Sequence, residues 1–206
     1  MSILVVHPGA YYHIEGFESP RYAGYFDALV RPEDLPKTDL SVHNVVLIPC
    51  RTPADRMQPH VAQLRAYLDA GGTVVATGES ESQLFLPGIT FTPQPTNFWW
   101  WLTPGADLGV RIAAPDHALF EHLAQRDVTW HLHGWFDPPD GVEVLAVNGE
   151  GKPILYVDDI TTAGRMVITS LDPFFHHGSH FMPATTRFLD GFLPWMRSEL
   201  DQKAQK

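Results

Sequence analysis

Four short apolar runs, rich in β-branched residues, recur along the chain and stop at proline, glycine or aspartate. They cover residues 3–7, 45–48, 73–77 and 165–171. Runs of this length without polar alternation are typical of strands that are buried on both faces of a parallel sheet. Apolar residues at helical spacing lie between the second and third runs. Residues 45–78 therefore predict a strand–helix–strand unit whose strands pair in parallel.

The other segments carry different patterns. Residues 10–20 predict a long loop and residues 21–30 a helix, while prolines and glycines break residues 85–115. Further strands are expected in the second half, over residues 129–136, 142–147 and 153–157. Pro183 is expected to open a closing helix. We predict one α/β domain, residues 1–206, with a mostly parallel central sheet and extra antiparallel strands in its second half.

Composition narrows the classes of function. Lys and Arg number 14 against 24 Asp and Glu, a formal net charge of −10, which argues against a nucleic-acid surface. No apolar run approaches the ~20 residues of a membrane span, and the first residues carry no signal-peptide pattern, so we expect no membrane association and a cytoplasmic location. The single cysteine, Cys50, excludes an intramolecular disulfide.

Candidate chemistry lies just after the predicted strands, because open parallel sheets bind ligands at the carboxyl ends of their strands. Gly78-Glu79-Ser80-Glu81-Ser82 is similar to a nucleophile elbow. This pattern makes Ser80 a candidate nucleophile, with Asp172 and His176 as its catalytic partners. The alternative is an ordinary strand-to-helix turn in which Ser80 or Glu79 caps the helix.

Histidines cluster in two further segments. Asp172 precedes His176, His177 and His180, and strand alternation would place His131 and His133 on one face. Imidazole and carboxylate suit zinc, iron or manganese. Neither segment has the full ligand spacing of a zinc signature, so the sequence predicts no metal and no cofactor. A polar loop that lines a cleft is the alternative for residues 172–180.

The predicted topology brings these loops to one edge of the sheet. The side chains that we expect to converge there are Tyr11, Tyr12, Glu79, Ser80, Asp172 and His176. Tyr11, Tyr12, Glu79, His177 and His180 are the predicted ligand contacts. Aromatic rings beside polar groups suit a sugar, and the run Trp99-Trp100-Trp101 would suit either a sugar or a partner surface.

The order of these elements resembles the class I glutamine amidotransferase-like superfamily and, within it, the ThuA-like proteins. The segments that carry the resemblance are Ile3-Leu-Val-Val-His7, Asn44 to Pro49, Leu64 to Gly72, Thr73 to Gly78, His117-Ala-Leu-Phe120 and Gly164 to Leu171, followed by a histidine-bearing loop and a helix with Trp195. The resemblance implies a flavodoxin-like three-layer sandwich and, loosely, a ligand of the sugar class.

Amidotransferase chemistry does not follow from this resemblance. The superfamily's amidotransferases place a cysteine at the elbow where this chain has Gly78-Glu79-Ser80, and His-Pro-Glu where it has Asp172-Pro173-Phe174. Cys50 follows a different strand. The resemblance thus implies a protein without glutaminase activity that binds a small polar ligand. The alternatives are a serine hydrolase that uses Ser80, and a protein whose aromatic surface forms a homo-oligomer.

Overall fold

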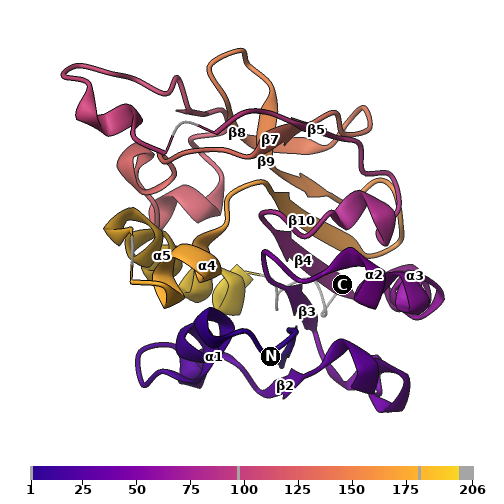
Figure 1. Cartoon of the computed structure of the whole chain (residues 1–206). Helices are drawn as coiled ribbons and strands as arrows, with labels where there is room; N and C mark the ends of the chain where they lie inside the picture. The colour runs from indigo at the N-terminus through magenta and orange to yellow at the C-terminus, as the bar shows by residue number, and fades with distance from the viewer. Residues whose placement is uncertain (1, 97, 181, 200–206) are drawn as a thin grey trace.

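An eight-stranded mixed sheet forms the centre of the computed structural model, which describes residues 2–96, 98–180 and 182–199 (Figure 1). The strand order is β2-β1-β3-β4-β10-β9-β8-β6. The first five strands are parallel, and the last three alternate in direction. In chain order they are β1 (Ile3–Val6), β2 (Ala28–Val30), β3 (Val45–Ile48), β4 (Thr73–Thr77), β6 (Arg111–Ile112), β8 (Glu143–Val147), β9 (Pro153–Asp158) and β10 (Arg165–Thr169). β5 (Phe91–Pro93) and β7 (Gly134–Phe136) form a separate antiparallel pair.

The parallel core confirms the prediction from the apolar runs. β3 and β4 are parallel neighbours, with Val45 opposite Thr73, and β4 pairs in parallel with β10. Every residue of β1, β3 and β4 is buried. The antiparallel strands of the second half are also confirmed, and residues 149–151 form the hairpin turn between β8 and β9.

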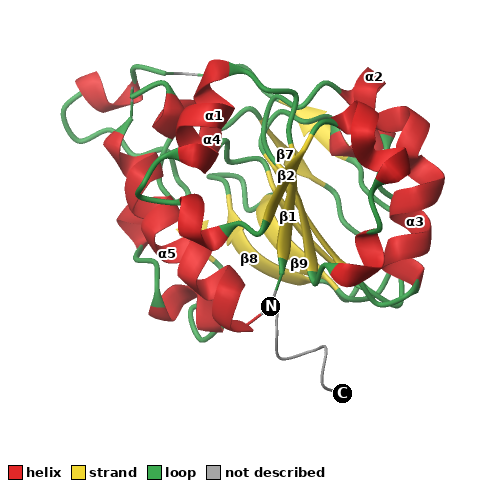
Figure 2. Cartoon of the chain, turned by 90° about the horizontal axis from the view of Figure 1, so that it is seen from below, coloured by secondary structure: helices red, strands yellow, loops and turns green. Residues whose placement is uncertain are grey.

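Helices cover both faces of the sheet (Figure 2). On one side lie α1 (Tyr11–Glu18), α4 (Pro173–Gly178) and α5 (Pro183–Glu199), and on the other lie α2 (Ala54–Met57) and α3 (Val61–Asp69). Alternate residues of β1 therefore enter two different cores, Ile3 and Val5 one and Leu4 and Val6 the other. Within the described residues, no helix is both long and apolar enough to span a membrane.

Two predictions near the amino terminus were wrong. Residues 10–20 contain helix α1 rather than only a loop, and α1 packs closely on α4, where Gly16 faces Phe174. Residues 21–30 form a 3-10 turn (Ala23–Tyr25) and then β2, rather than a helix. β2 pairs with β1, so hydrogen bonds to a distant strand outweigh the local helical spacing.

The segment from 85 to 136 also differs from its prediction. β5 and β6 are only three and two residues long and were not foreseen. Of residues 129–136, only 134–136 form a strand. Two or three residues are too few to show the alternation that identifies a strand in the sequence. These strands form because they pair with β7 and β8, respectively.

Candidate functional site

The loops that follow β3, β4 and β10 meet at the carboxyl edge of the sheet. Gly78 is the contact point: its φ is +59°, and a Cβ added there would lie 2.5 Å from the Cβ atoms of both Cys50 and Asp172. Only glycine combines this left-handed backbone with so close an approach. The backbone of Arg51 then donates to the Glu79 carbonyl at 2.9 Å, which joins the first two loops.

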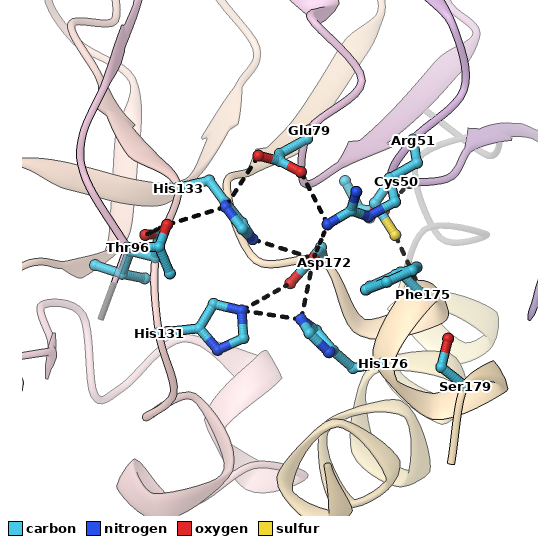
Figure 3. Close-up of polar contacts among 12 residues, drawn as sticks. Cys50, Arg51, Glu79, Thr96, His131, His133, Asp172, Phe175, His176 and Ser179 are labelled. Carbon is cyan, nitrogen blue, oxygen red and sulfur yellow. Dashed lines mark hydrogen bonds and ion pairs between the residues drawn. The ribbon is translucent and has the colours of Figure 1, made fainter. Parts of the chain in front are cut away.

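A chain of polar contacts connects five ionisable side chains at this edge (Figure 3). His133 donates from Nδ1 to Glu79 Oε1 at 3.0 Å and from Nε2 to Asp172 Oδ2 at 3.2 Å. His176 Nε2 lies 3.2 Å from the same Asp172 oxygen and 2.9 Å from His131 Nε2. One carboxylate thus holds two imidazoles, and the third imidazole contacts one of these.

Burial and charge give these groups different protonation behaviour. Burial by itself would lower the pKa of His133, but its hydrogen bonds to Asp172 and Glu79 raise that pKa to about 9. Burial would raise the pKa of Asp172, yet the hydrogen bonds from His133 and His176 bring it below its usual value. The hydrogen bond from His133 also lowers the pKa of Glu79. Burial lowers the pKa of His131 to about 4. His133 is therefore an imidazolium between two carboxylates.

Arg51 supplies the positive charge on the open side of this network. Its guanidinium lies 3.1 Å from Glu79 Oε2 and 3.9 Å from Asp172 Oδ2, and it stacks over the Phe175 ring at 3.8 Å. Arg51 has a left-handed backbone with φ of 60°. Glu81, on the loop after β4, and His180, just after α4, are the other non-glycine residues with positive φ in the described ranges. Strained backbone of this kind gathers at functional sites.

A cavity of about 310 Å³ opens beside Glu79 and His133. Its lining combines carboxylates, an amide and two phenyl rings: Gly78, Glu79, Glu81, Ser82, Gln83, Phe91, Pro93, His133 and Phe136. A larger cavity of about 540 Å³ lies at the opposite edge, next to Asn44 and Thr73 at the amino ends of β3 and β4. We place the site at the smaller cavity because ligands of parallel sheets bind at the carboxyl edge.

Three of the predicted site residues share the network: Glu79, Asp172 and His176. The hydroxyl of Ser80 is buried and has no hydrogen-bond partner among the described residues, so no Ser–His pair is formed. Tyr12 packs edge-on against Phe175 at 4.9 Å. Tyr11 is 68% exposed, and its hydroxyl contacts Ser179.

The other two predicted ligand contacts lie outside the network. His177 is hydrogen-bonded to Thr186 of α5 at 2.8 Å, and the exposed His180 lies 3.6 Å from Glu15 of α1. The sequence predictions did not place His133 or Arg51 in the site. The His-x-His spacing of residues 131–133 was the available signal for His133. Arg51 lies just after the predicted strand at 45–48, where candidate chemistry is expected, but no motif singles it out.

Cys50 follows β3 and lies beneath the site. It is fully buried, its sulfur accepts the Phe175 backbone N–H at 3.3 Å, and burial raises the pKa of its thiol well above the usual value. A nucleophilic thiol needs the opposite conditions, namely exposure and a lowered pKa. The elbow after β4 carries Glu79 and Ser80 instead of a cysteine.

Comparison with known proteins identifies the fold. The sequence matches no protein-family profile and no curated protein at significant similarity. A putative GMP synthase subunit from Thermoplasma acidophilum superposes with a TM-score of 0.59 and 13% identity, over 100% of this chain and 98% of the other. A cytoplasmic protein from Salmonella typhimurium gives 0.58 and 11%, over 95% and 98%. An exo-β-1,4-mannosidase from an Opitutaceae bacterium gives 0.53 and 13%, over 96% of this chain and 36% of the enzyme.

Identities this low show a shared fold and nothing more. This chain and the Thermoplasma protein share one fold over almost the whole length of both. The narrower resemblance to ThuA-like proteins stays a prediction. The chain therefore shares its overall fold with this putative GMP synthase subunit.

Proposed function

We propose that the chain binds a small, neutral, polyhydroxylated molecule of the sugar class in the cavity beside Glu79, and that it does not hydrolyse glutamine. The observation that carries this proposal is the lining of that cavity, with Glu79, Glu81 and Gln83 as polar groups and the rings of Phe91 and Phe136 as apolar ones. Ligand sites typically pair apolar walls with a few convergent polar groups in cavities of roughly 300–1,000 Å³.

The charge of the lining favours hydroxyl groups. Carboxylates accept hydrogen bonds from hydroxyls and repel anions, and the amide of Gln83 can both donate and accept. Glu79 is held in its ionised form by His133 and Arg51, so its orientation is fixed before a ligand arrives. The phenyl rings offer flat apolar surfaces to the C–H faces of a sugar.

The proposed absence of glutaminase activity rests on the β4 elbow, on Asp172-Pro173-Phe174 in place of His-Pro-Glu, and on the environment of Cys50. The β4 elbow has no thiol, and the Cys50 thiol is buried and hydrogen-bonded to backbone. A serine hydrolase is the second candidate, and it has less support. Ser80 lies on the elbow, but its hydroxyl is hydrogen-bonded to no histidine among the described residues, and Asp172 is occupied by His133 and His176.

Wider parts of the proposal rest on the fold neighbours. The GMP synthase relative supports membership of the class I glutamine amidotransferase-like superfamily, with a flavodoxin-like three-layer arrangement. Two cytoplasmic Salmonella proteins support a cytoplasmic location. The mannosidase and β-galactosidases among the neighbours contain this fold as about a third of their length. No nucleic acid and no membrane are expected as partners, and a homo-oligomer stays a prediction.

A panel of monosaccharides and polyols, with glutamine included, tests the proposal by ligand-observed NMR and ammonia release. We expect saturable binding of at least one polyol, which Glu81→Gln weakens several-fold, and no ammonia. The matched control is Glu121→Gln, an exposed carboxylate remote from the cavity lining. Equal binding by both variants, or ammonia release that Cys50→Ala abolishes, would contradict the proposal.

A further inference from the structure

We propose that His131, His133, Asp172 and His176 form a binding site for one divalent transition-metal ion of the zinc class. All four residues are buried, with 0–7% of their surface exposed. One ligand atom from each lies within 4.8 Å of the others. This site uses the same edge of the sheet as the proposed ligand cavity, and His133 is the residue common to both.

The spacing of the ligand atoms fits a four-coordinate ion. Bonds of about 2.0–2.2 Å in a tetrahedron place the ligand atoms roughly 3.3–3.6 Å apart. The measured separations are 2.9 Å for His131 Nε2 to His176 Nε2, and 3.2 Å from Asp172 Oδ2 to the Nε2 atoms of both His133 and His176. Shifts of a few tenths of an ångström would bring these edges to the tetrahedral value.

Protons alone satisfy this cluster poorly. At 2.9 Å, one of the two Nε2 atoms of His131 and His176 must donate to the other. His176 Nε2 also faces Asp172 Oδ2, which only accepts when it is ionised, so one proton is shared between two acceptors. Asp172 Oδ1 is buried, has no hydrogen-bond partner among the described residues and lies 3.9 Å from His131 Nε2.

A cation resolves both problems. It would bind the Nε2 lone pairs of the three imidazoles and an oxygen of Asp172, and the Nε2 protons of His133 and of the His131–His176 pair would be released to solvent. Three imidazoles and one carboxylate are ligands that zinc, iron and related ions accept. This proposal differs from the sequence-based prediction of no metal, which was made because neither histidine segment has the ligand spacing of a zinc signature.

The outer contacts of the cluster resemble those of established metal sites. A histidine that binds a metal commonly donates its other ring N–H to a carboxylate, which fixes the orientation of the ring. His133 does so here, since Nδ1 donates to Glu79 Oε1 at 3.0 Å while Nε2 faces the cluster. Arg51 in turn holds the other oxygen of Glu79 at 3.1 Å. Glu79 is therefore a positioning residue for the ion.

Four protein ligands leave a tetrahedral ion no open position, so the ion would organise the site rather than act on a ligand directly. It would tie residues 131–133 to the start of α4, two segments some forty positions apart in the sequence. His133 lines the ligand cavity, so the ion would fix one of its walls.

Calorimetric titration of Zn²⁺ into the chelator-treated full chain tests this inference. We expect one ion per chain. His131→Gln removes a ligand and should weaken binding by at least about 100-fold, and Glu79→Gln, which alters only an outer contact, by about 10–100-fold. The matched control is His177→Gln: His177 neighbours His176 on α4 but is bonded to Thr186 outside the cluster. Its affinity should stay within a factor of about two of the native chain.

A second readout covers the case in which His131→Gln fails to fold. Co²⁺ bound to the native chain should show the intense visible absorption of a tetrahedral ion. No saturable binding, equal loss in His131→Gln and His177→Gln, or the weak spectrum of an octahedral ion would overturn the metal site. Polyol binding measured with and without Zn²⁺ separates the two proposals. The cavity can bind a polyol when the four-residue cluster binds no ion, and the cluster can bind an ion when the cavity binds no polyol.

Discussion

The two halves of the main sheet contribute to the site in different ways. In the parallel half, the loops after β3, β4 and β10 reach one edge because parallel strands all end there, and they bring Arg51, Glu79 and Asp172. The segment that leads into β7 of the small β5–β7 sheet contributes His131 and His133, which are not at a parallel strand end. Topology therefore fixes the carboxylates and His176, while long-range packing fixes the imidazoles of His131 and His133.

The packing around residues 131–133 shows this dependence. Thr96 donates its hydroxyl to the Leu132 carbonyl at 2.9 Å, and the Phe98 ring lies 4.6 Å from the ring of His131. Both contacts come from the proline-rich segment before β6. Strand order therefore sets one part of the site, and contacts that hold an irregular segment against it set the other part.

The largest effect should come from the residue that joins the two halves. Asp172→Ala removes a fully buried carboxylate that accepts from His133 and His176. Breaking a buried ion pair on one side leaves the other charge uncompensated, so we expect a loss of about 3–5 kcal/mol in the free energy of unfolding by urea, with chelator present. Asp55→Ala, an exposed carboxylate on α2, should change it by less than about 0.5 kcal/mol. Equal losses would show that Asp172 does not join the halves.

A smaller effect should come from the close approach at the β4 elbow. Gly78→Ala places a methyl group 2.5 Å from Cys50 and Asp172 in a left-handed backbone, and we expect a loss of roughly 2–4 kcal/mol from strain and overpacking. Gly71→Ala is the matched control, because Gly71 also has positive φ but nothing lies within 4 Å of an added Cβ. It should lose only about 1–2 kcal/mol. Equal losses of stability for Gly78→Ala and Gly71→Ala, measured by thermal or urea unfolding, would show that close contact with Cys50 and Asp172 does not require a glycine at position 78.

Acid should destabilise the parallel half through His7 and His13, which lie after β1 and on α1. Burial lowers the pKa of each from 6.5 to about 4. Between pH 6.5 and 4 the unfolded chain takes up protons that the folded chain does not, so stability falls as pH falls. His13→Gln should reduce the slope of unfolding free energy against pH by up to about 1.4 kcal/mol per pH unit. An unchanged slope would contradict a neutral, buried His13.

The smallest effect should come from the exposed aromatic surface. Trp101 is 58% exposed, so Trp101→Ser should change the unfolding free energy by less than about 0.5 kcal/mol. Sedimentation tests the predicted homo-oligomer in the same variant. If the native chain self-associates through this surface, Trp101→Ser should shift it toward monomer. A native chain that sediments as a monomer at all concentrations would contradict the predicted homo-oligomer.

The sequence predicts most of the parallel half well, because each fully buried strand is a continuous apolar run that can be identified from adjacent residues alone. The neighbours β3 and β4, the convergence of Glu79 with Asp172 and the place of His176 follow from that pattern and from strand order. It predicts the shortest strands, β2 of the parallel half among them, and the segment before β7 poorly. β2 and β5 form only against partner strands that are distant in the sequence. Arg51 reaches the site through a left-handed backbone conformation, which no pattern in the sequence predicts. His131 and His133 share a cluster only because a separate sheet holds them there.

Anomalous X-ray scattering from zinc-soaked crystals tests most directly whether the two halves meet in one metal centre. The account predicts a single peak within about 2.0–2.2 Å of the Nε2 atoms of His131, His133 and His176 and of a carboxylate oxygen of Asp172. A chain whose only zinc peaks lie on surface histidines, with hydrogen bonds alone between these four side chains, would contradict it.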